Sequence, residues 1–301
     1  MATAKKEELA LIKKDTVDVV ADKVRKFQES GELHFPADYS PENAMKAAWL
    51  TLQETVDKDD KPALEVCTRN SIANALLNMV VQGLNPMKKQ CYYIVYGNKL
   101  TLQRSYFGTM HIAKTVDPEI ETIVADVVYQ DDVFEFAKIR GCTEITKHVS
   151  KLQNMDPKKI IAAYCSIFWR NGKEESTIMT IDEIKQSWRQ SKTNPVLADG
   201  KLKEGSTHAK FTAEMAKRTV VNRACKAIIN SSSDSTLLIK AFHASDADLA
   251  EAEAQEEIHD NANTVYVDTK EINEETGEVL TDDGPLAPAP FLSAPQEDDL
   301  P

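Results

Sequence analysis

Residues 206–230 constrain the fold most, because the sequence predicts them as one long helix. No Gly or Pro interrupts this stretch. Ser206 or Thr207 can cap its first turn, since a side-chain oxygen there accepts an N–H that the helix leaves unpaired. The serine-rich run 231–235 is typical of a helix end. Apolar residues lie on two faces of the helix, so we expect neighbouring elements to cover it on more than one side.

This helix carries five cations and one acid. The cations are Lys210, Lys217, Arg218, Arg223 and Lys226, and the acid is Glu214. Long cationic side chains often lie along apolar surface with their charged ends in water, paired with nearby acids. They also suit a ridge that binds phosphate. The helix alone leaves both interpretations open.

The charge of the chain is unevenly distributed. The formal net charge is −12, yet residues 246–301 hold 17 Asp and Glu against one Lys. Residues 1–245 hold 35 Lys and Arg against 31 Asp and Glu. A mildly basic body with a strongly acidic tail is the kind of asymmetry that indicates a nucleic-acid partner.

The five cysteines are scattered, and no Cys-x-x-Cys pair occurs. We therefore expect neither a zinc site nor a disulfide framework, but buried thiols in a reducing compartment. The amino-terminal segment lacks an apolar signal core, and no run of 18 apolar residues is present. These features predict a soluble intracellular protein.

Periodicity separates a helical first part from a strand-rich second part. Helices are predicted at 4–29, 41–56 and 63–82, the last ending at Gly83. Strands or hairpin arms are predicted at 91–96, 99–104, 123–129, 133–136, 144–149, 160–170 and 174–180, with helices at 106–115 and 181–190. A further helix begins near residue 236 and loses its apolar face in an acidic stretch.

We therefore predict an α+β fold in three parts. A helical amino-terminal region at 1–86 supplies oligomer contacts. An α+β core at 87–249 packs a small antiparallel sheet with hairpins on the long central helix. The acidic tail at 250–301 is mostly disordered, since it has too little apolar surface to offset the entropy of ordering.

The sequence offers little enzymatic chemistry. No Gly-x-x-x-x-Gly-Lys-Ser/Thr loop is present, so ATP-driven motors are not expected. The pair Asp131-Asp132 is the only hint of a metal nuclease, and acid pairs of this kind usually sit in solvated turns. The six histidines are isolated. We expect neither an enzyme nor a cofactor.

A binding surface is the remaining interpretation. The hairpin segment 92–108 mixes aromatic residues with Lys99 and Arg104. Cations can hold phosphate, while hydroxyls and amides contact sugar and base. Arg189 and Lys192 precede the central helix and add the same chemistry. The alternative is that the tyrosines are strand residues packed on a core.

Four spaced motifs resemble the RecT family of phage single-strand annealing proteins. They are Gln-Gly-Leu-Asn-Pro at 82–86, Leu-Gln-Arg-Ser-Tyr-Phe-Gly at 102–108, Glu-Met-Ala-Lys-Arg-Thr at 214–219, and Asn-Arg at 222–223. The resemblance covers about residues 30–245. Arg218 stands where the family usually has a second Lys, which keeps the charge.

The resemblance implies ATP-independent binding of single-stranded DNA and annealing to a complementary strand. It further implies rings or helical filaments, a Rad52-like core, a partner 5′-to-3′ exonuclease, and the cytoplasm of a bacterial host. The tail ends Gln-Glu-Asp-Asp-Leu-Pro, similar to the acidic tip of bacterial single-stranded-DNA-binding proteins, but lacks their final Phe. This departure weighs against docking of the tail into the pockets that receive those tips. The alternatives are a solubilising tail and a tail that competes for the DNA groove. The host single-stranded-DNA-binding protein stays open as a partner.

We predict one DNA-binding groove between the central helix and the first hairpin. Its residues are Lys99, Arg104, Tyr106, Arg189, Lys192, Lys210, Lys217, Arg218 and Arg223. Arg223 ranks lower, because helical geometry places it on a different face from Lys217. The alternative function is a passive single-stranded DNA coat without annealing activity.

Overall fold

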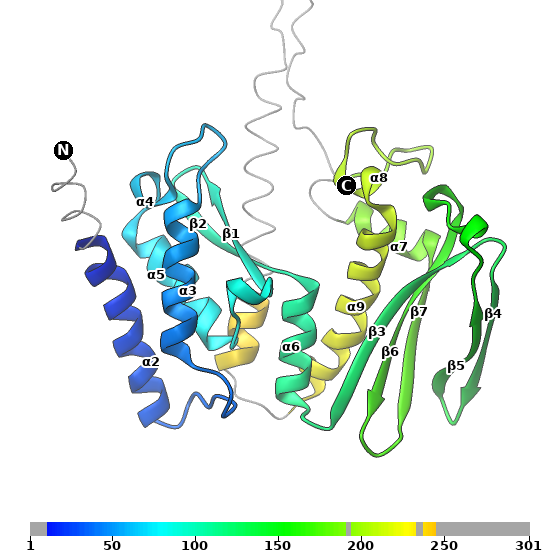
Figure 1. Ribbon diagram of the computed structural model, residues 1–301, viewed down its shortest axis with the longest axis horizontal. Coiled ribbons are helices and arrows are strands. Elements are labelled where there is room, and N and C mark those ends of the chain that lie inside the picture. The colour runs from blue at the N-terminus through cyan, green and yellow to red at the C-terminus, as the bar shows by residue number, and fades with distance from the viewer. Residues whose placement is uncertain (1–10, 191–193, 233–236, 245–301) are drawn as a thin grey trace, which may run out of the picture. The chain divides into compact units, whose positions relative to one another are not determined.

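The computed structural model describes residues 11–190, 194–232 and 237–244 (Figure 1). The chain divides into two compact units, 1–258 and 259–301, and every described residue belongs to the first. The fold is α+β, as predicted. The boundaries predicted at 86 and 249 stay predictions, and the tail lies outside the described residues.

The amino-terminal part is helical. It contains the π-helical turn η1 (Lys14–Asp18), α2 (Val19–Glu29), α3 (Pro41–Glu54), α4 (Ala63–Val66) and α5 (Arg69–Val81). The Ser40 hydroxyl caps α3 by accepting the Asn43 N–H at 3.3 Å. The single helix predicted at 63–82 is wrong: Cys67 and Thr68 are extended, and the Thr68 hydroxyl starts α5 by accepting the Ser71 N–H at 3.3 Å. Gly83 follows α5 with φ +66°, which a glycine adopts without strain.

The first hairpin forms as predicted. After the 3₁₀ turn η2 (Pro86–Lys88), β1 (Cys91–Tyr96) pairs with β2 (Lys99–Arg104) around Gly97, whose φ is +57°. Tyr93 of β1 is buried, as are Leu100, Thr101 and Leu102 of β2, and the Tyr93 hydroxyl lies 3.0 Å from the Met79 sulfur of α5. The hairpin is therefore attached to the helical part.

The second half holds two further sheets. Helix α6 (Tyr106–Val116) leads into a three-stranded antiparallel sheet in the order β3 (Ile120–Tyr129), β6 (Ile160–Trp169) and β7 (Glu174–Thr180). Strands β4 (Val133–Ile139) and β5 (Cys142–Val149) form a separate ribbon, and the 3₁₀ turns η3 (Leu152–Asn154) and η4 (Pro157–Lys159) follow it. Alternate residues of β6 (Ala163, Cys165 and Ile167) are buried. Burial raises the pKa of the Cys165 thiol, and Cys225 of the central helix raises it further, which places this face of the sheet against that helix.

The central helix lies where the sequence predicts it, but it is broken. Helix α8 (Thr207–Lys210) ends at Phe211, whose φ and ψ of −130° and 48° are not helical, and α9 (Thr212–Ser231) follows. Ser206 caps α8 by accepting the Ala209 N–H at 3.2 Å. Helix α9 contacts β3, β6 and β7 and also α6 and α7 (Ile181–Arg189) (Figure 1). The predicted cover on more than one side is confirmed.

Residues 237–244 are helical and pack into the body through Leu238, Ala241 and Phe242. Across the described residues, none of the helices has both the length and the apolar composition needed to cross a membrane.

Candidate nucleic-acid interface

One stripe of α9 faces α7 across a cavity of about 660 Å³, which we call the α7–α9 groove. The α9 residues recur at intervals of three or four, so they share a face of the helix. The lining residues are Met179, Glu183, Gln186, Ser187, Trp188, Gln190, His208, Met215, Arg218, Thr219, Asn222, Arg223 and Lys226. Cations, amides and hydroxyls therefore converge on one concave surface.

Trp188 connects the two helices that form the groove, α7 and α9. Its indole N–H donates to the Thr219 hydroxyl at 2.8 Å, and that hydroxyl donates to the Met215 carbonyl at 2.8 Å. The Trp188 ring meets the His208 ring edge-on with centroids 4.7 Å apart. Burial lowers the pKa of His208, and the charge of Arg218 lowers it further, so the imidazole is neutral at pH 7. Trp188 is buried, so it belongs to the core as well as to the groove lining.

The cations of the groove are Arg218, Arg223 and Lys226. Neither guanidinium lies within ion-pair distance of a carboxylate in the described part of the chain. The one acid of the lining, Glu183, belongs to the capping box of α7, where it accepts the Thr180 N–H at 2.8 Å. These hydrogen bonds lower the pKa of Glu183, and the charge of Arg223 adds to the effect. Two arginines thus present their donors to the groove, and guanidinium groups match phosphate geometry well.

Lys217 points to a different side of α9. Its ammonium lies 2.6 Å from a Glu214 carboxylate oxygen. Burial lowers the pKa of Lys217, but Glu214, Asp126 and Tyr106 outweigh it and the pKa is raised. The Tyr106 ring packs on Phe107 with centroids 4.1 Å apart. Lys217 and Tyr106 therefore form a cluster beside α6 and β3, away from the lining of the α7–α9 groove.

Arg104 is a structural residue. It is 8% exposed, and one guanidinium nitrogen donates to the Gln82 amide oxygen at 2.7 Å and to the Phe242 carbonyl at 3.2 Å. The guanidinium also lies 3.8 Å from the centre of the Phe242 ring, and its Nε donates to Thr109 at 3.3 Å. The predicted phosphate contact needs an accessible cation, so we leave Arg104 out of the DNA groove.

The structure does not bring the other predicted residues into the groove. Lys99 lines a second cavity, between α5 and β2. Arg189 is exposed at the end of α7, and Lys210 is exposed in α8. Lys192 lies outside the described residues. Of the nine predicted residues, Arg218 and Arg223 line the α7–α9 groove.

The predicted DNA-binding set left out several groove residues, namely Lys226, Asn222, Gln186 and Gln190. The sequence contains part of the pattern that would identify them, because Arg218, Asn222 and Lys226 recur at four-residue intervals on one helix face. The contribution of α7 could not be found this way, because it depends on how α7 packs against α9.

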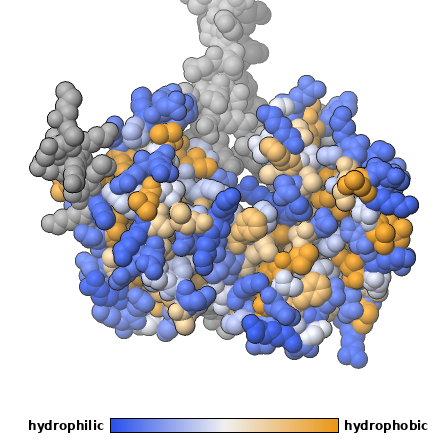
Figure 2. Space-filling view, in the orientation of Figure 1, coloured by the Kyte–Doolittle hydropathy of each residue, from blue (hydrophilic) through white to orange (hydrophobic). Residues whose placement is uncertain are grey.

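The β4–β5 ribbon is a different kind of surface. Phe136 at its middle is 50% exposed, and the exposed cations Lys138 and Arg140 follow on β4 and its turn. Figure 2 shows apolar residues among hydrophilic ones at the side where Figure 1 draws this ribbon. Aromatic rings and cations together suit stacked bases. The ribbon lacks the amide-lined hollow of the α7–α9 groove. It is therefore the second candidate for the DNA-binding surface.

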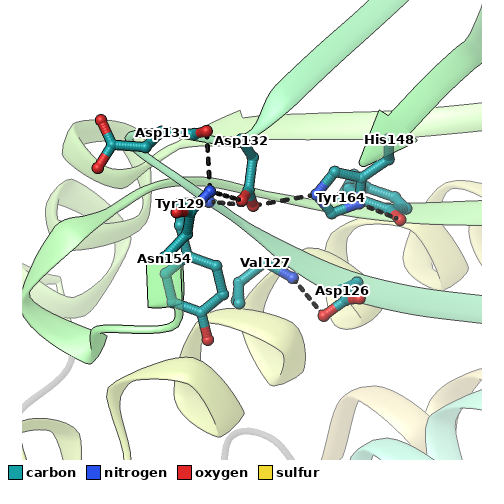
Figure 3. A network of polar contacts seen from close by, with 8 residues as sticks. All are labelled: Asp126, Val127, Tyr129, Asp131, Asp132, His148, Asn154 and Tyr164. Carbon is teal, nitrogen blue, oxygen red and sulfur yellow. Dashed lines mark hydrogen bonds and ion pairs between the residues drawn. The ribbon is translucent and has the colours of Figure 1, made fainter. Parts of the chain in front are cut away.

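Asp132 ties this ribbon to the sheet (Figure 3). Its carboxylate accepts the Tyr129 N–H at 2.9 Å and the Asn154 amide at 3.0 Å, and lies 3.2 Å from His148 Nε2. His148 Nδ1 in turn lies 3.1 Å from the Tyr164 hydroxyl. Within the described residues, no three or more His, Cys, Asp or Glu side chains are grouped to hold a metal ion. The Asp132 contacts join the end of β3 to β5 and to η3.

Asp132→Asn should lower the free energy of unfolding by about 2 kcal/mol at pH 7. Burial raises the pKa of Asp132, but the hydrogen bonds outweigh it and lower the pKa from 3.8 to about 2. The folded-state pKa lies below the unfolded one. The contribution is therefore complete above the unfolded value and is lost as the pH falls through the folded value.

Urea denaturation at pH 7 and pH 3 measures this effect, with Asp131→Asn as the control because Asp131 is exposed. The difference in the free energy of unfolding between wild type and Asp132→Asn should be smaller at pH 3 than at pH 7. An equal difference at both pH values would contradict the stabilising role of the ionised Asp132 carboxylate.

The fold and the groove define an α+β protein whose central helix offers arginines to a polar, concave surface. A sequence model of the RecT family matches residues 42–264, which is most of the chain. The chain belongs to the RecT family, a family of single-strand annealing proteins of DNA recombination. No curated protein matches the sequence.

Proposed function

We propose that this protein binds single-stranded DNA in the α7–α9 groove and anneals complementary strands without ATP. One observation carries the proposal. Arg218, Arg223 and Lys226 lie on one stripe of a rigid helix, over a hollow otherwise lined mainly by amides, hydroxyls and rings. Such a surface holds a sugar-phosphate chain by charge and hydrogen bonding.

The mechanism needs no covalent step. Cations on α9 neutralise the phosphates of a bound strand and so lower its repulsion for a second strand. Amides of Gln186, Gln190 and Asn222 supply neutral contacts to sugar and phosphate. Because the protein contacts the sugar-phosphate backbone of the DNA, the base edges stay available for pairing.

Assembly completes the surface. Residues 1–245 carry 35 Lys and Arg against 31 Asp and Glu, a small excess for one copy. A ring or helical filament repeats the groove along the DNA strand, so the weak binding of each copy adds to that of the others. We assign the oligomer contacts to the helical region 1–86. The single strands would come from a 5′-to-3′ exonuclease in the bacterial cytoplasm, with the host single-stranded-DNA-binding protein as a further partner.

The test mixes two complementary labelled oligonucleotides with the full chain and no nucleotide cofactor. An annealing protein raises the pairing rate above the spontaneous rate. A passive coat lowers it, and that result would overturn the proposal.

A further inference from the structure

Exposed apolar side chains gather where the β4–β5 ribbon meets η3. Val133 of β4 lies directly opposite Val149 of β5, so the two side chains share one face of the ribbon. Leu152 of η3 is 85% exposed, and Met155 follows it and is also exposed. The hydrogen bonds of the Asn154 amide hold η3 against the start of β4. We call Val133, Val149, Leu152 and Met155 the ribbon patch.

The two valines lie on the outer face of the ribbon. Their neighbours Phe134 and His148 are also paired across the ribbon, and the rings of both lie near the Tyr164 ring of β6, with centroids 5.5 Å from it. Phe134 and His148 therefore face the three-stranded sheet. Because successive side chains of a strand point to opposite faces, Val133 and Val149 face away from that sheet.

The chemistry of the ribbon patch suits a protein partner better than DNA. Single exposed apolar residues are common, but a group of them is typical of a protein–protein contact. None of the four residues carries an aromatic ring on which a base could stack. Lys151 and Lys158 beside the patch are exposed and form no ion pair within the described part of the chain. Two ribbon patches placed face to face would bring these cations together, so the patch favours a partner surface that carries acid.

A second exposed apolar surface lies on the first helices. Leu11 and Val19 are both exposed although eight residues separate them. The turn η1 between them is π-helical and takes up one extra residue, so eight residues return the chain to the same face. Ile12 and Val20 show the same spacing on the buried face. Asp18 adds an exposed carboxylate next to Val19. We call Leu11, Asp18 and Val19 the helical patch.

The two patches lie at opposite ends of the described residues. Figure 1 shows α2 at one end and the β4–β5 ribbon at the other. A contact between two different surfaces of the same chain leaves one of each free, so further copies add head to tail. Repeated addition gives a ring or a helical filament, whereas a contact between two identical surfaces stops at a dimer.

We propose that the ribbon patch of one copy packs on the helical patch of the next copy. Their apolar side chains meet, and Lys151 and Lys158 of one copy face Asp18 of the other. This inference rests on the assembly step of the proposed function, which assigns oligomer contacts to residues 1–86, and it supplies the opposing surface. Neither patch shares a residue with the lining of the α7–α9 groove, so the contact uses none of the groove residues.

The test uses the full chain and breaks one patch at a time. Leu152→Glu places a carboxylate in the ribbon patch, and Val19→Glu places one in the helical patch. Each variant should need at least about tenfold more protein to assemble, because it loses the burial of one large apolar side chain. Light scattering over a dilution series measures the size, both without DNA and with a long single strand. Met87→Glu is the matched control, since Met87 of η2 is an exposed apolar residue outside both patches.

Mixing the two variants gives the sharpest result. Each variant keeps one intact patch, so an equimolar mixture should form dimers through a single contact and no larger species. Recovery of dimers also shows that both variants are folded. A mixture that stays monomeric would contradict the inference.

Three further results would overturn the inference. The first is a Val19→Glu variant that assembles like the wild type, because the ribbon patch would then pair with itself. The second is a wild-type chain that stays monomeric with and without DNA. The third is a Leu152→Glu variant that keeps its assembly size but loses affinity for single-stranded DNA, which would make the ribbon patch a DNA surface.

The outcomes separate this contact from the proposed function. If the size measurements contradict the contact, the annealing proposal still stands or falls on the pairing rate of complementary oligonucleotides. A wild-type chain that assembles through the two patches but slows pairing keeps the contact and overturns the proposed function.

Discussion

The double variant Arg218→Ala/Arg223→Ala should lose about a hundredfold in affinity for single-stranded DNA. Each guanidinium lost from a phosphate removes a charge-assisted hydrogen bond, typically about 1.5 kcal/mol or more, and 1.4 kcal/mol is a factor of ten. The loss should be uniform across sequences. Titrations over a range of salt concentrations should show a shallower slope, by about 0.7 for each phosphate contact removed.

The matched control is Arg170→Ala, since Arg170 is exposed in the turn between β6 and β7 and does not line the groove. It should leave affinity and slope close to the wild type. Lys217→Ala gives a further comparison. Because Lys217 pairs with Glu214 outside the groove, we expect a smaller change in slope than for the arginines. A larger effect at Lys217 than at Arg218 and Arg223 would move the DNA path to the other side of α9.

Arg104→Ala should destabilise the fold by about 3 kcal/mol, the usual scale for breaking a buried charged network. The change removes the hydrogen bonds that Arg104 donates to the Gln82 amide oxygen and to the Phe242 carbonyl, and it removes the cation over the Phe242 ring. Residues 237–244 should then detach from the body. Chemical denaturation measures the loss, and protection of these residues from proteolysis measures the detachment.

Gln103→Ala on the same strand is the control, because Gln103 is only half-buried. At a temperature where Arg104→Ala remains folded, its affinity for single-stranded DNA should match the wild type. Intact stability with lost affinity would contradict the structural role and return Arg104 to the interface.

Helical periodicity and turn chemistry predicted most of the elements. Capping residues and glycines marked the starts and ends, as Ser40 and Gly83 show. Two helices predicted as continuous are broken, at Thr68 and at Phe211. Thr68 is a good cap that the apolar pattern around it concealed. Nothing local in the sequence marks the break at Phe211.

The candidate site was harder to predict, because neighbouring residues on a helix point about 100° apart. Lys217 and Arg218 are adjacent in sequence but lie on different sides of α9. Helical geometry alone favours Lys217 over Arg223, whereas the structure groups Arg223 with Arg218. Arg104 carries the charge expected of a phosphate contact, and only its burial under residues 237–244 shows its structural role.

The most direct measurement is photo-crosslinking of a single-stranded oligonucleotide to the full chain, with the attached peptides identified by mass spectrometry. If the α7–α9 groove carries the DNA, crosslinks should fall in α7 and along the Met215–Lys226 stripe of α9, and should weaken in the Arg218→Ala/Arg223→Ala variant. Crosslinks confined to the β4–β5 ribbon or to the Lys217 side of α9 would contradict the assignment.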